Sequence, residues 1–220
     1  MLSAVIFDMD GVIVDSEPLH IKAEKKTLAP YGIDVDEKTL QSFMGRTSRV
    51  LLKSIIHDYR LNTTLDKIYP THKENLRHLY STELRLIPGI MTLLSDLQDA
   101  GIDMALASST DLDLISVVLT TFTLHGFFRV VVSGEDVQRA KPHPDIFLET
   151  AERLGCLPEA CVVIEDSRAG VRAAKGAGMT CVGFRSPHGQ DQDLDQADVI
   201  VKAINEITLN SLSVLVDQRA

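Results

Sequence analysis

The sequence predicts a doubly wound parallel α/β sheet with an inserted all-α cap. Short apolar runs rich in β-branched residues alternate with longer segments of helical spacing, the order that builds strand–helix–strand units and a parallel sheet. The alternation is interrupted once, between about residues 17 and 85, where no strand-like run occurs. Polar residues follow successive apolar runs, as expected where parallel strands end at a ligand-binding edge.

Two separated parts of the chain, residues 1–15 and 88–220, are expected to form the sheet and its helices. The first strand runs from Ala4 to Asp8, because this short run is apolar and contains β-branched and aromatic residues. Strand and helix patterns alternate again after Pro88-Gly89. The later strands are predicted over residues 103–107, 130–132, 162–164, 181–184 and 199–201. The helices are predicted over residues 90–100, 112–122, 144–154 and 169–177, with one more at the C-terminus.

The cap is expected to comprise residues 16–87, where leucine, isoleucine and phenylalanine recur at helical spacing. Pro18 suits the first turn of a helix that Tyr31-Gly32 would stop. Its helices are predicted over residues 19–28, 36–43, 48–59 and 65–80. The connections near residues 15–17 and 85–88 are the expected hinges of a cap that closes over a ligand.

Composition narrows the class of protein. The 220 residues are 45% hydrophobic, enough to bury a substantial core, and a net charge of −9 argues against non-specific nucleic-acid binding. Asp8 and Asp10 interrupt the first apolar run, which has no basic leader, so neither a signal peptide nor a membrane span is expected. The three cysteines lack metal-type spacing and fit free thiols of a reducing compartment. We therefore expect a cytoplasmic monomer that binds a small molecule, without nucleic acid or membrane.

Carboxylates follow two strands of the predicted sheet. Asp8 and Asp10 come at the end of the first strand, and Glu165 and Asp166 follow the strand over residues 162–164. Parallel strands bring these ends into one crevice. Because carboxylates this close repel each other, they require a cation or a shared proton. Hard oxygen ligands in this number suit Mg²⁺ rather than zinc.

Hydroxyl and ammonium groups follow the other two strands. Ser108 and Ser109 precede a helix, and Lys141 lies between strand and helix in a proline-containing loop. Helix N-terminal N–H groups and a lysine suit a phosphoryl group. Each of these residues also has an ordinary structural explanation, as a turn, a helix cap or a solvated loop lysine. Their joint occurrence after successive strands favours a phosphoryl-transfer site.

The segments Asp8-Met9-Asp10-Gly11, Ser108, Lys141-Pro142 and Glu165-Asp166-Ser167 occur in this order along the chain. Together they resemble the four motifs of the haloacid dehalogenase superfamily of phosphohydrolases, and the resemblance extends to about Phe184. The segment from Val14 to His20, followed by a helical insertion, looks like the subgroup whose cap follows the first motif. That subgroup contains β-phosphoglucomutase and many sugar-phosphate phosphatases.

The resemblance implies a Mg²⁺-dependent phosphohydrolase of small sugar or polyol phosphates. Asp8 would attack phosphorus to form an aspartyl-phosphate, and Asp10 would protonate the leaving oxygen and then deprotonate the acceptor. Mg²⁺ would be held by the Asp8 carboxylate, the Asp10 backbone carbonyl and Asp166, with Glu165 as a ligand or as a partner of the ligands. The groups that would hold the phosphoryl oxygens are Gly11, Ser108, Ser109 and Lys141.

The phosphoryl acceptor is water in a phosphatase and a second sugar hydroxyl in a mutase of the β-phosphoglucomutase type. The segment Gly45 to Arg49 resembles the phosphate-reading cap loop of the mutase, but Arg49 stands one residue later than the mutase arginine. Leu112 also replaces an asparagine that contacts substrate in the mutase pattern. These departures favour a phosphatase. The cap candidates for substrate binding are His20, Arg46, Arg49 and Lys73, each equally explained as a residue on a cap helix face.

A two-component receiver domain is an alternative from another class. It too combines a doubly wound sheet with a phosphorylated Asp, Mg²⁺, a Ser or Thr and a Lys. A receiver, however, has its accepting Asp at a later strand end and needs no helical insertion of this size. The predicted cap and the acid/base role of Asp10 therefore favour an enzyme over a signalling module.

Overall fold

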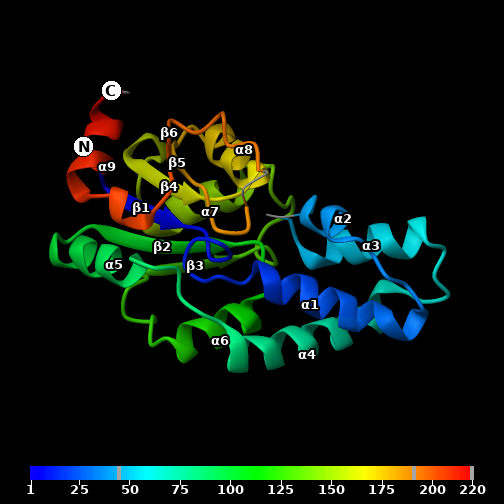
Figure 1. Cartoon of the computed structure of the whole chain (residues 1–220). Helices are drawn as coiled ribbons and strands as arrows, with labels where there is room; N and C mark the ends of the chain where they lie inside the picture. Colours follow the sequence, from blue (N-terminus) through cyan, green and yellow to red (C-terminus); the bar gives the residue numbers. More distant parts are fainter. Residues whose placement is uncertain (44–45, 190–191, 219–220) are drawn as a thin grey trace.

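A computed structural model describes residues 1–43, 46–189 and 192–218. Within these residues the centre of the fold is a parallel sheet in the order β3-β2-β1-β4-β5-β6 (Figure 1). Its strands are β1 Ala4–Phe7, β2 Asp103–Ser108, β3 Val130–Ser133, β4 Cys161–Glu165, β5 Thr180–Phe184 and β6 Val199–Val201. In this order β1 is central, and the chain reverses its direction of winding between β1 and β4, the position where open α/β sheets bind ligands.

Helices cover both faces of the sheet because its strands are apolar on both sides. Val5 and Phe7 point to the face covered by α5 Ile90–Asp99, α6 Leu112–Thr121 and α9 Leu209–Asp217. Ala4 and Ile6, which alternate with them, point to the face covered by α7 Asp145–Leu154 and α8 Arg168–Gly176. Short 3₁₀ turns are formed by η1 Ala29–Tyr31, η2 Pro158–Ala160 and η3 Ile204–Glu206.

The cap lies at one end of the molecule, beyond the carboxyl ends of the strands (Figure 1). It contains α1 Glu17–Leu28, α2 Glu37–Gln41, α3 Ser48–Asp58 and α4 Leu65–Glu83. Asp36 and Thr47 cap α2 and α3 by accepting a hydrogen bond from a backbone N–H of the first turn. Apolar residues of all four helices, among them Leu28, Leu40 and Leu52, form a small core of the cap.

The cap also contacts the core directly, along α4 and α6 (Figure 1). The Tyr69 hydroxyl donates a 2.6 Å hydrogen bond to Asp111, and Lys73 Nζ lies 3.0 Å from Asp111 Oδ2. Lys73 and Arg77 both pair with Asp113, at 2.8 and 2.6 Å. Polar contacts between a helix of the cap and the start of a core helix therefore hold the two parts together beside the site.

The fold class predicted from the sequence is confirmed, with the helical insertion after the first strand. Element ends differ by one to three residues: α4, for example, continues to Glu83 rather than residue 80. Strand β4 includes Glu165, which pairs in register with Gly183 although it is acidic. The division into residues 1–15 with 88–220 and residues 16–87 stays a prediction. Asp15 N donates to Arg85 O at 2.9 Å, so the two connections run side by side where the prediction places the hinges.

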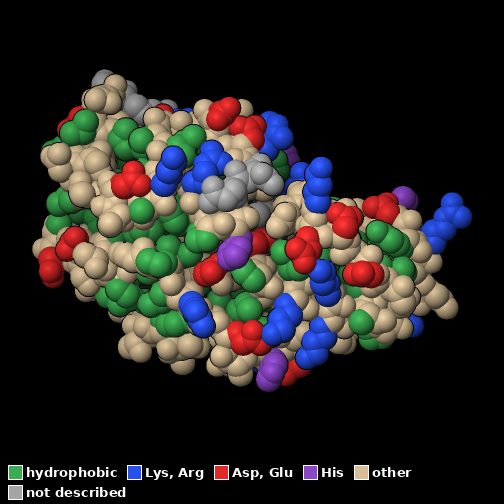
Figure 2. Space-filling view, in the orientation of Figure 1, with side chains coloured by type: hydrophobic (Ala, Val, Ile, Leu, Met, Phe, Trp, Pro, Cys, Tyr) green, Lys and Arg blue, Asp and Glu red, His purple; other side chains and the backbone are tan. Residues whose placement is uncertain are grey.

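Within the described part of the chain, no helix is long and apolar enough to cross a membrane. The three cysteines are free, and Cys161 and Cys181 are buried. On the face shown in Figure 2, acidic and basic side chains of the cap are interspersed rather than gathered into a field of one sign.

Candidate active site

Three carboxylates meet where β1 and β4 end. Asp8 directly follows β1, and its N–H donates a 3.0 Å hydrogen bond to Ile164 O of β4. Glu165 ends β4, and Asp166 follows it. Each of Asp8, Glu165 and Asp166 offers an oxygen that lies within 4.8 Å of the others, and all three side chains are buried. The structure brings together three of the four carboxylates that the sequence places at this edge of the sheet.

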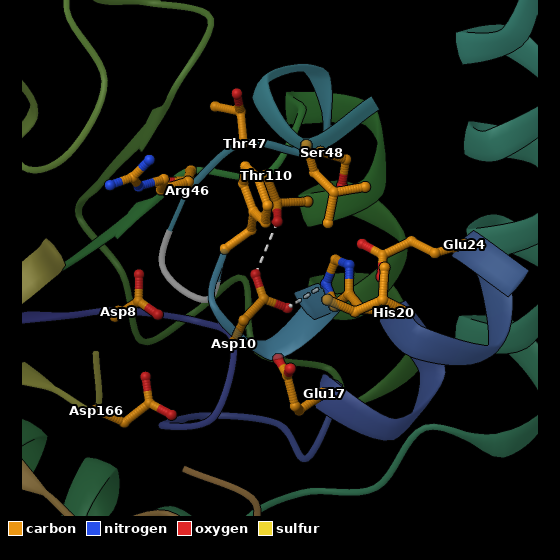
Figure 3. Close-up of a pocket in the computed structure, with 14 residues that line it drawn as sticks. Asp8, Asp10, Glu17, His20, Glu24, Arg46, Thr47, Ser48, Thr110 and Asp166 are labelled. Carbon is orange, nitrogen blue, oxygen red and sulfur yellow. Dashed lines mark hydrogen bonds and ion pairs between the residues drawn. The ribbon is translucent and has the colours of Figure 1, made fainter. Parts of the chain in front are cut away.

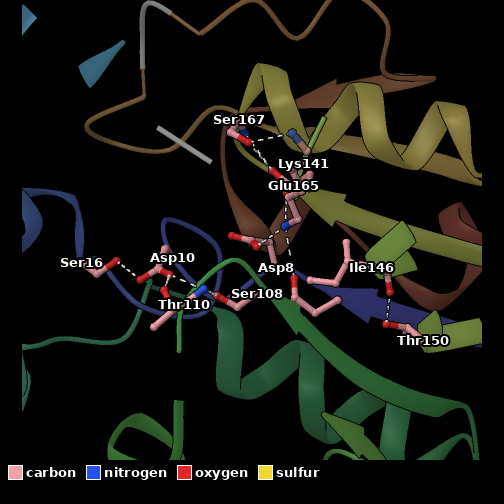
Figure 4. A network of polar contacts seen from close by, with 12 residues as sticks. Asp8, Asp10, Ser16, Ser108, Thr110, Lys141, Ile146, Thr150, Glu165 and Ser167 are labelled. Carbon is pink, nitrogen blue, oxygen red and sulfur yellow. Dashed lines mark hydrogen bonds and ion pairs between the residues drawn. The ribbon is translucent and has the colours of Figure 1, made fainter. Parts of the chain in front are cut away.

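Lys141 brings the positive charge to this cluster from the loop between β3 and α7. Its Nζ donates to Asp8 Oδ1 at 2.6 Å, to Glu165 Oε1 at 2.7 Å and to Ala107 O at 3.2 Å (Figure 4). Burial opposes the charged ammonium, but the charges of Asp8 and Glu165 raise the pKa of Lys141 above its usual value. Ser167 donates to the second oxygen of Glu165 through both its N–H and its hydroxyl, each at 3.0 Å. Lys141 is therefore a fixed cation and not a solvated loop lysine.

One ammonium does not balance three buried carboxylates. Burial raises the pKa of Asp8 to about 8 against the opposing charge of Lys141. Burial and the neighbouring charge of Glu165 raise the pKa of Asp166 well above its usual value. The Oδ2 atom of Asp166 is buried and has no hydrogen-bond partner among the described residues. Excess negative charge with a free oxygen ligand fits a hard divalent cation at this cluster.

Gly11 leaves the room that this cluster requires. A Cβ atom at Gly11 would lie 1.9 Å from Asp166 Oδ2, and the backbone there is left-handed with a φ of +79°. Both features favour glycine. The sequence placed Gly11 among the phosphate-binding residues; in the structure it lies against the carboxylate cluster.

The carboxylate of Asp10 points away from this cluster, toward the cap (Figure 3). It lies within hydrogen-bond distance of five side chains from both parts of the molecule. On Oδ1 they are Ser16 at 2.6 Å, Tyr80 at 3.0 Å and His20 at 3.3 Å. On Oδ2 they are Thr110 at 2.7 Å and Ser108 at 3.3 Å; Figure 4 shows Ser16, Ser108 and Thr110 around Asp10. Both cap and core thus fix the orientation of this one carboxylate.

These donors decide the protonation of Asp10. Burial alone would raise its pKa, but the hydrogen bond and the charge of His20, with the Ser16 and Thr110 hydroxyls, hold the pKa of Asp10 well below its usual range. The pKa of His20 rises to about 9 although burial opposes its charge, because Asp10 accepts its hydrogen bond and Glu24 and Glu17 add negative charge. Asp10 is therefore a carboxylate beside a protonated imidazole, an arrangement that can accept a proton and return it.

A cavity between the cap and the core joins these groups (Figure 3). Its core side is formed by Asp8, Asp10, Ser109, Thr110 and Asp166. Its cap side is formed by Glu17, His20 and Glu24 of α1 and by Leu40, Phe43, Arg46, Thr47, Ser48 and Leu51. A ligand in this cavity would contact the carboxylate cluster at one end and α1 at the other.

Two of the four cap candidates lie at this cavity and two do not. His20 and Arg46 line it, whereas Arg49 stacks over the Tyr69 ring at 4.0 Å and Lys73 pairs with Asp111 and Asp113. A role of Arg49 and Lys73 in substrate binding stays a prediction. Gly45, which the sequence places in the same loop, lies outside the described residues.

The sequence reasoning missed several residues of the site. Tyr80 and Ser16 contact Asp10, and no local pattern distinguishes them from other polar residues of the cap. Glu24 could have been found, because it lies four residues after His20 in the helix predicted over residues 19–28 and so shares its face. Glu17 precedes that predicted helix and joins the same face because α1 begins two residues earlier. That face would have indicated a polar surface turned toward the catalytic groups.

Comparisons with known proteins agree with the site. A model of the haloacid dehalogenase-like hydrolase family matches residues 5–184. The phosphorylated carbohydrates phosphatase of Thermotoga maritima is 35% identical over 178 residues, which cover 81% of this chain and 82% of that protein. Hexitol phosphatase B of Escherichia coli K12 is 30% identical over 225 residues, which cover 95% and 96%. A crystal structure of β-phosphoglucomutase from Clostridium difficile is similar with a TM-score of 0.88 and 27% identity, covering 100% of this chain and 99% of that one.

Proposed function

The chain belongs to the haloacid dehalogenase-like hydrolase family, and on that premise we propose that it hydrolyses small sugar or polyol phosphates with Mg²⁺ through a phosphorylated Asp8. The enzyme is a phosphatase of this family and not a receiver-type signalling module. Two relatives, named as phosphatases of phosphorylated carbohydrates and of hexitols, support the substrate class.

One observation carries the proposal: two adjacent carboxylates lie in opposite environments at the same cavity. Asp8 lies against Lys141 and beside Asp166, where the ammonium and a bound divalent cation would hold it as an anion next to the phosphoryl group. Asp10 lies two residues later, and its carboxylate turns toward the cap, where His20, Ser16 and Tyr80 contact it. A carboxylate at a cation site beside one that is paired with a histidine fits a nucleophile with an acid/base group next to it.

The proposed reaction has two steps. An oxygen of Asp8 attacks the phosphorus and the bond from phosphorus to the ester oxygen breaks. The leaving oxygen takes a proton through Asp10, which receives it from the protonated His20 along their hydrogen bond. Asp10 is then a carboxylate beside a neutral imidazole, the pair takes a proton from water, and the hydroxide oxygen displaces phosphate from Asp8. Lys141 holds positive charge beside the phosphoryl oxygens throughout, because Asp8 and Glu165 keep it protonated.

The carboxylate cluster would hold Mg²⁺ through Asp8, Asp166 and the backbone carbonyl of Asp10. Glu165 has both oxygens engaged by Lys141 and Ser167, so it serves better as a partner that orients the cluster than as a direct ligand. A bound divalent cation would supply charge that attracts the phosphoryl oxygens and lowers the repulsion between a phosphate dianion and Asp8.

A phosphosugar mutase of the β-phosphoglucomutase type is the second candidate. The similarity to the β-phosphoglucomutase structure over the whole chain and the position of His20 at the cavity favour it. Arg46 lines the cavity as well and could hold a second phosphate. Against the mutase, Arg49 and Lys73 are engaged with Tyr69 and with two core aspartates, and do not line the cavity. The mutase needs cationic cap residues for the phosphate that does not react, whereas a phosphatase does not.

The test is phosphate release from a panel of sugar and polyol phosphates with Mg²⁺, including β-glucose 1-phosphate. Asp8→Asn keeps the shape of the side chain and removes the nucleophile, so we expect a loss on the order of a thousandfold or more. Asp99→Asn, at an exposed carboxyl at the end of α5, is the matched control and should keep full activity.

Rapid release from one or a few members, lost in Asp8→Asn alone, is the expected result. Conversion of β-glucose 1-phosphate to glucose 6-phosphate after addition of a bisphosphate primer, with little release, would make the protein a mutase. Undiminished activity of Asp8→Asn would remove Asp8 as the nucleophile.

A further inference from the structure

Glu24 is a buried carboxylate that the reaction does not use. It lies on α1, one turn after His20, and only 5% of its surface is exposed. None of the described residues forms a hydrogen bond or an ion pair with its carboxylate. The Glu24 oxygens are not among the fully buried unpartnered atoms of the described residues, so they face the cavity, where water or a ligand has to supply their hydrogen bonds.

The Glu24 side chain extends from α1 into the cavity that contains Asp8 and Asp10 (Figure 3). In this view Asp8 and Glu24 lie on opposite sides of Asp10. The phosphoryl end of a substrate at Asp8 therefore leaves the rest of the molecule to reach toward Glu24. Ser48 adds a hydroxyl near this part of the cavity, and Leu40 and Leu51 add apolar surface.

The charged residues near Glu24 do not supply the hydrogen bonds that its carboxylate lacks. His20 is the cation that acts on it, but His20 already donates to Asp10 and contacts the Tyr80 hydroxyl at 2.8 Å. Glu17, the other ionisable group of the same face, is acidic and repels Glu24. Arg46, the other cation on the cap side of the cavity, lies on the side of Asp8 in Figure 3 and away from Glu24. Among the described residues, the part of the cavity next to Glu24 therefore offers an acceptor of hydrogen bonds and little to attract a second phosphate.

We propose that Glu24 binds hydroxyl groups of the substrate and selects a neutral, polyhydroxylated sugar or polyol at the end remote from the phosphate. This inference rests on the proposed function and deepens it by naming the residue that recognises the substrate class. A carboxylate can accept from two neighbouring hydroxyls, and a carboxyl group can also donate to one, so vicinal hydroxyls satisfy it in either protonation state. An alkyl phosphate would leave Glu24 without a partner and bind more weakly.

The experiment compares two substrates of equal chain length within each variant: the best polyhydroxylated six-carbon substrate from the panel, and hexyl phosphate. Glu24→Leu and Glu24→Met replace the carboxylate by apolar groups of similar size, and Glu24→Gln keeps an oxygen acceptor. Glu37→Gln removes an exposed carboxylate from the neighbouring cap helix and serves as the control for charge. Thermal unfolding of each variant checks that it is folded.

In Glu24→Leu and Glu24→Met, we expect the ratio of kcat/KM for the hydroxylated substrate to that for hexyl phosphate to fall about tenfold or more, mainly through KM, because a hydrogen bond to a charged group is lost. Glu24→Gln should recover most of the ratio, and Glu37→Gln should equal the wild type.

An unchanged ratio in a folded apolar variant overturns the inference and leaves the phosphatase assignment intact. A wild type that hydrolyses hexyl phosphate as well as every sugar phosphate also overturns the inference. A wild type that hydrolyses no phosphate ester overturns the proposed function, and the inference with it.

Discussion

The carboxylates at the two ends of the cavity differ in whether the protein itself supplies their hydrogen-bond partners. At the core end, Asp8 and Glu165 are both within 2.7 Å of the Lys141 ammonium, and Ser167 donates to the remaining oxygen of Glu165. At the cap end, Glu24 is equally buried but no described group hydrogen-bonds to it. The core end is complete before a substrate arrives, apart from the charge that a divalent cation would supply, whereas the cap end depends on the substrate.

This difference corresponds to the two parts of the substrate that a phosphatase with a cap binds, the phosphoryl group and the rest of the molecule. The phosphoryl group is the same in every substrate, so the groups that contact it can be fixed in advance by strands and a buried lysine. The rest of the substrate varies, and on its side of the cavity no described group hydrogen-bonds to the Glu24 carboxylate of α1. Asp10 lies between the two ends and receives donors from both.

The largest expected effect is that of Lys141→Met, which removes the cation at the core end of the cavity. This change leaves Asp8 and Glu165 buried without their cation, and breaking a buried pair in this way costs about 3–5 kcal/mol of unfolding free energy. Phosphate release should fall on the order of a thousandfold, because positioned charge supplies most of the catalysis of phosphoryl transfer. Urea unfolding and phosphate-release assays measure the two effects.

The control for this change is Lys25→Met, which breaks an exposed pair of similar length. Lys25 Nζ lies 2.7 Å from Glu37 Oε1; the Glu37 side chain is exposed and that of Lys25 is partly exposed. Such a pair is worth about 1 kcal/mol or less. If both variants lost the same small amount of stability, the core cluster would not be held together by Lys141.

The contrast also explains what the sequence could predict. Asp8, Ser108 and Glu165 are each placed by the end of a strand, and the register of a parallel sheet brings strand ends together whatever the loops do. Their neighbourhood could therefore be inferred from the order of elements alone. The resemblance to a known family added roles but was not needed for the position of these residues.

The cap residues could not be placed in this way. Whether Lys73 reaches the cavity or the start of α6 depends on how α4 packs against the core, and no periodicity in the sequence fixes that packing. Tyr80 contacts Asp10 across 70 positions of sequence for the same reason. Only Glu24 and His20 had a usable signal, since helical spacing places them on one face.

A second test uses the pH dependence of stability, measured with EDTA present. Burial raises the pKa of Glu24 to about 8, against the opposing charge of His20, so folding favours its protonated form. The stability from this group is complete below its ordinary pKa of about 4.5 and is lost as pH rises toward 8. The groups facing it, Asp10, Glu17 and His20, remain in the variant Glu24→Leu. We expect that variant to gain several degrees in Tm over the wild type at pH 8 and much less at pH 5.

The control variant Glu37→Gln, at an exposed carboxylate, should shift Tm by the same small amount at both pH values. His20 also makes the wild type less stable as pH rises, because its pKa is raised to about 9 and its contribution is lost above about 6.5. The difference between Glu24→Leu and the wild type removes the larger part of this effect, which comes from Asp10, and leaves the smaller part that the charge of Glu24 contributes to the pKa of His20. A gain in Tm that did not change between pH 5 and pH 8 would show that Glu24 is not a buried, unpaired acid.

The smallest expected effect on catalysis is that of Lys73→Gln, which tests whether a cap cation serves the fold or the substrate. Lys73 joins the cap to Asp111 and Asp113 of the core, and its side chain is 25% exposed. Asp111 keeps the hydroxyl of Tyr69 as a donor in the variant, but its Oδ2 atom is buried and loses Lys73, so the loss of stability should be about 1–3 kcal/mol. Arg77→Gln removes a neighbouring pair to Asp113 and is the matched control.

Because neither side chain lines the cavity, KM for a sugar phosphate should change less than about threefold in both variants, under 1 kcal/mol. A tenfold rise in KM for Lys73→Gln alone would instead mean that the cap moves in the catalytic cycle and carries this lysine from the core aspartates to the substrate.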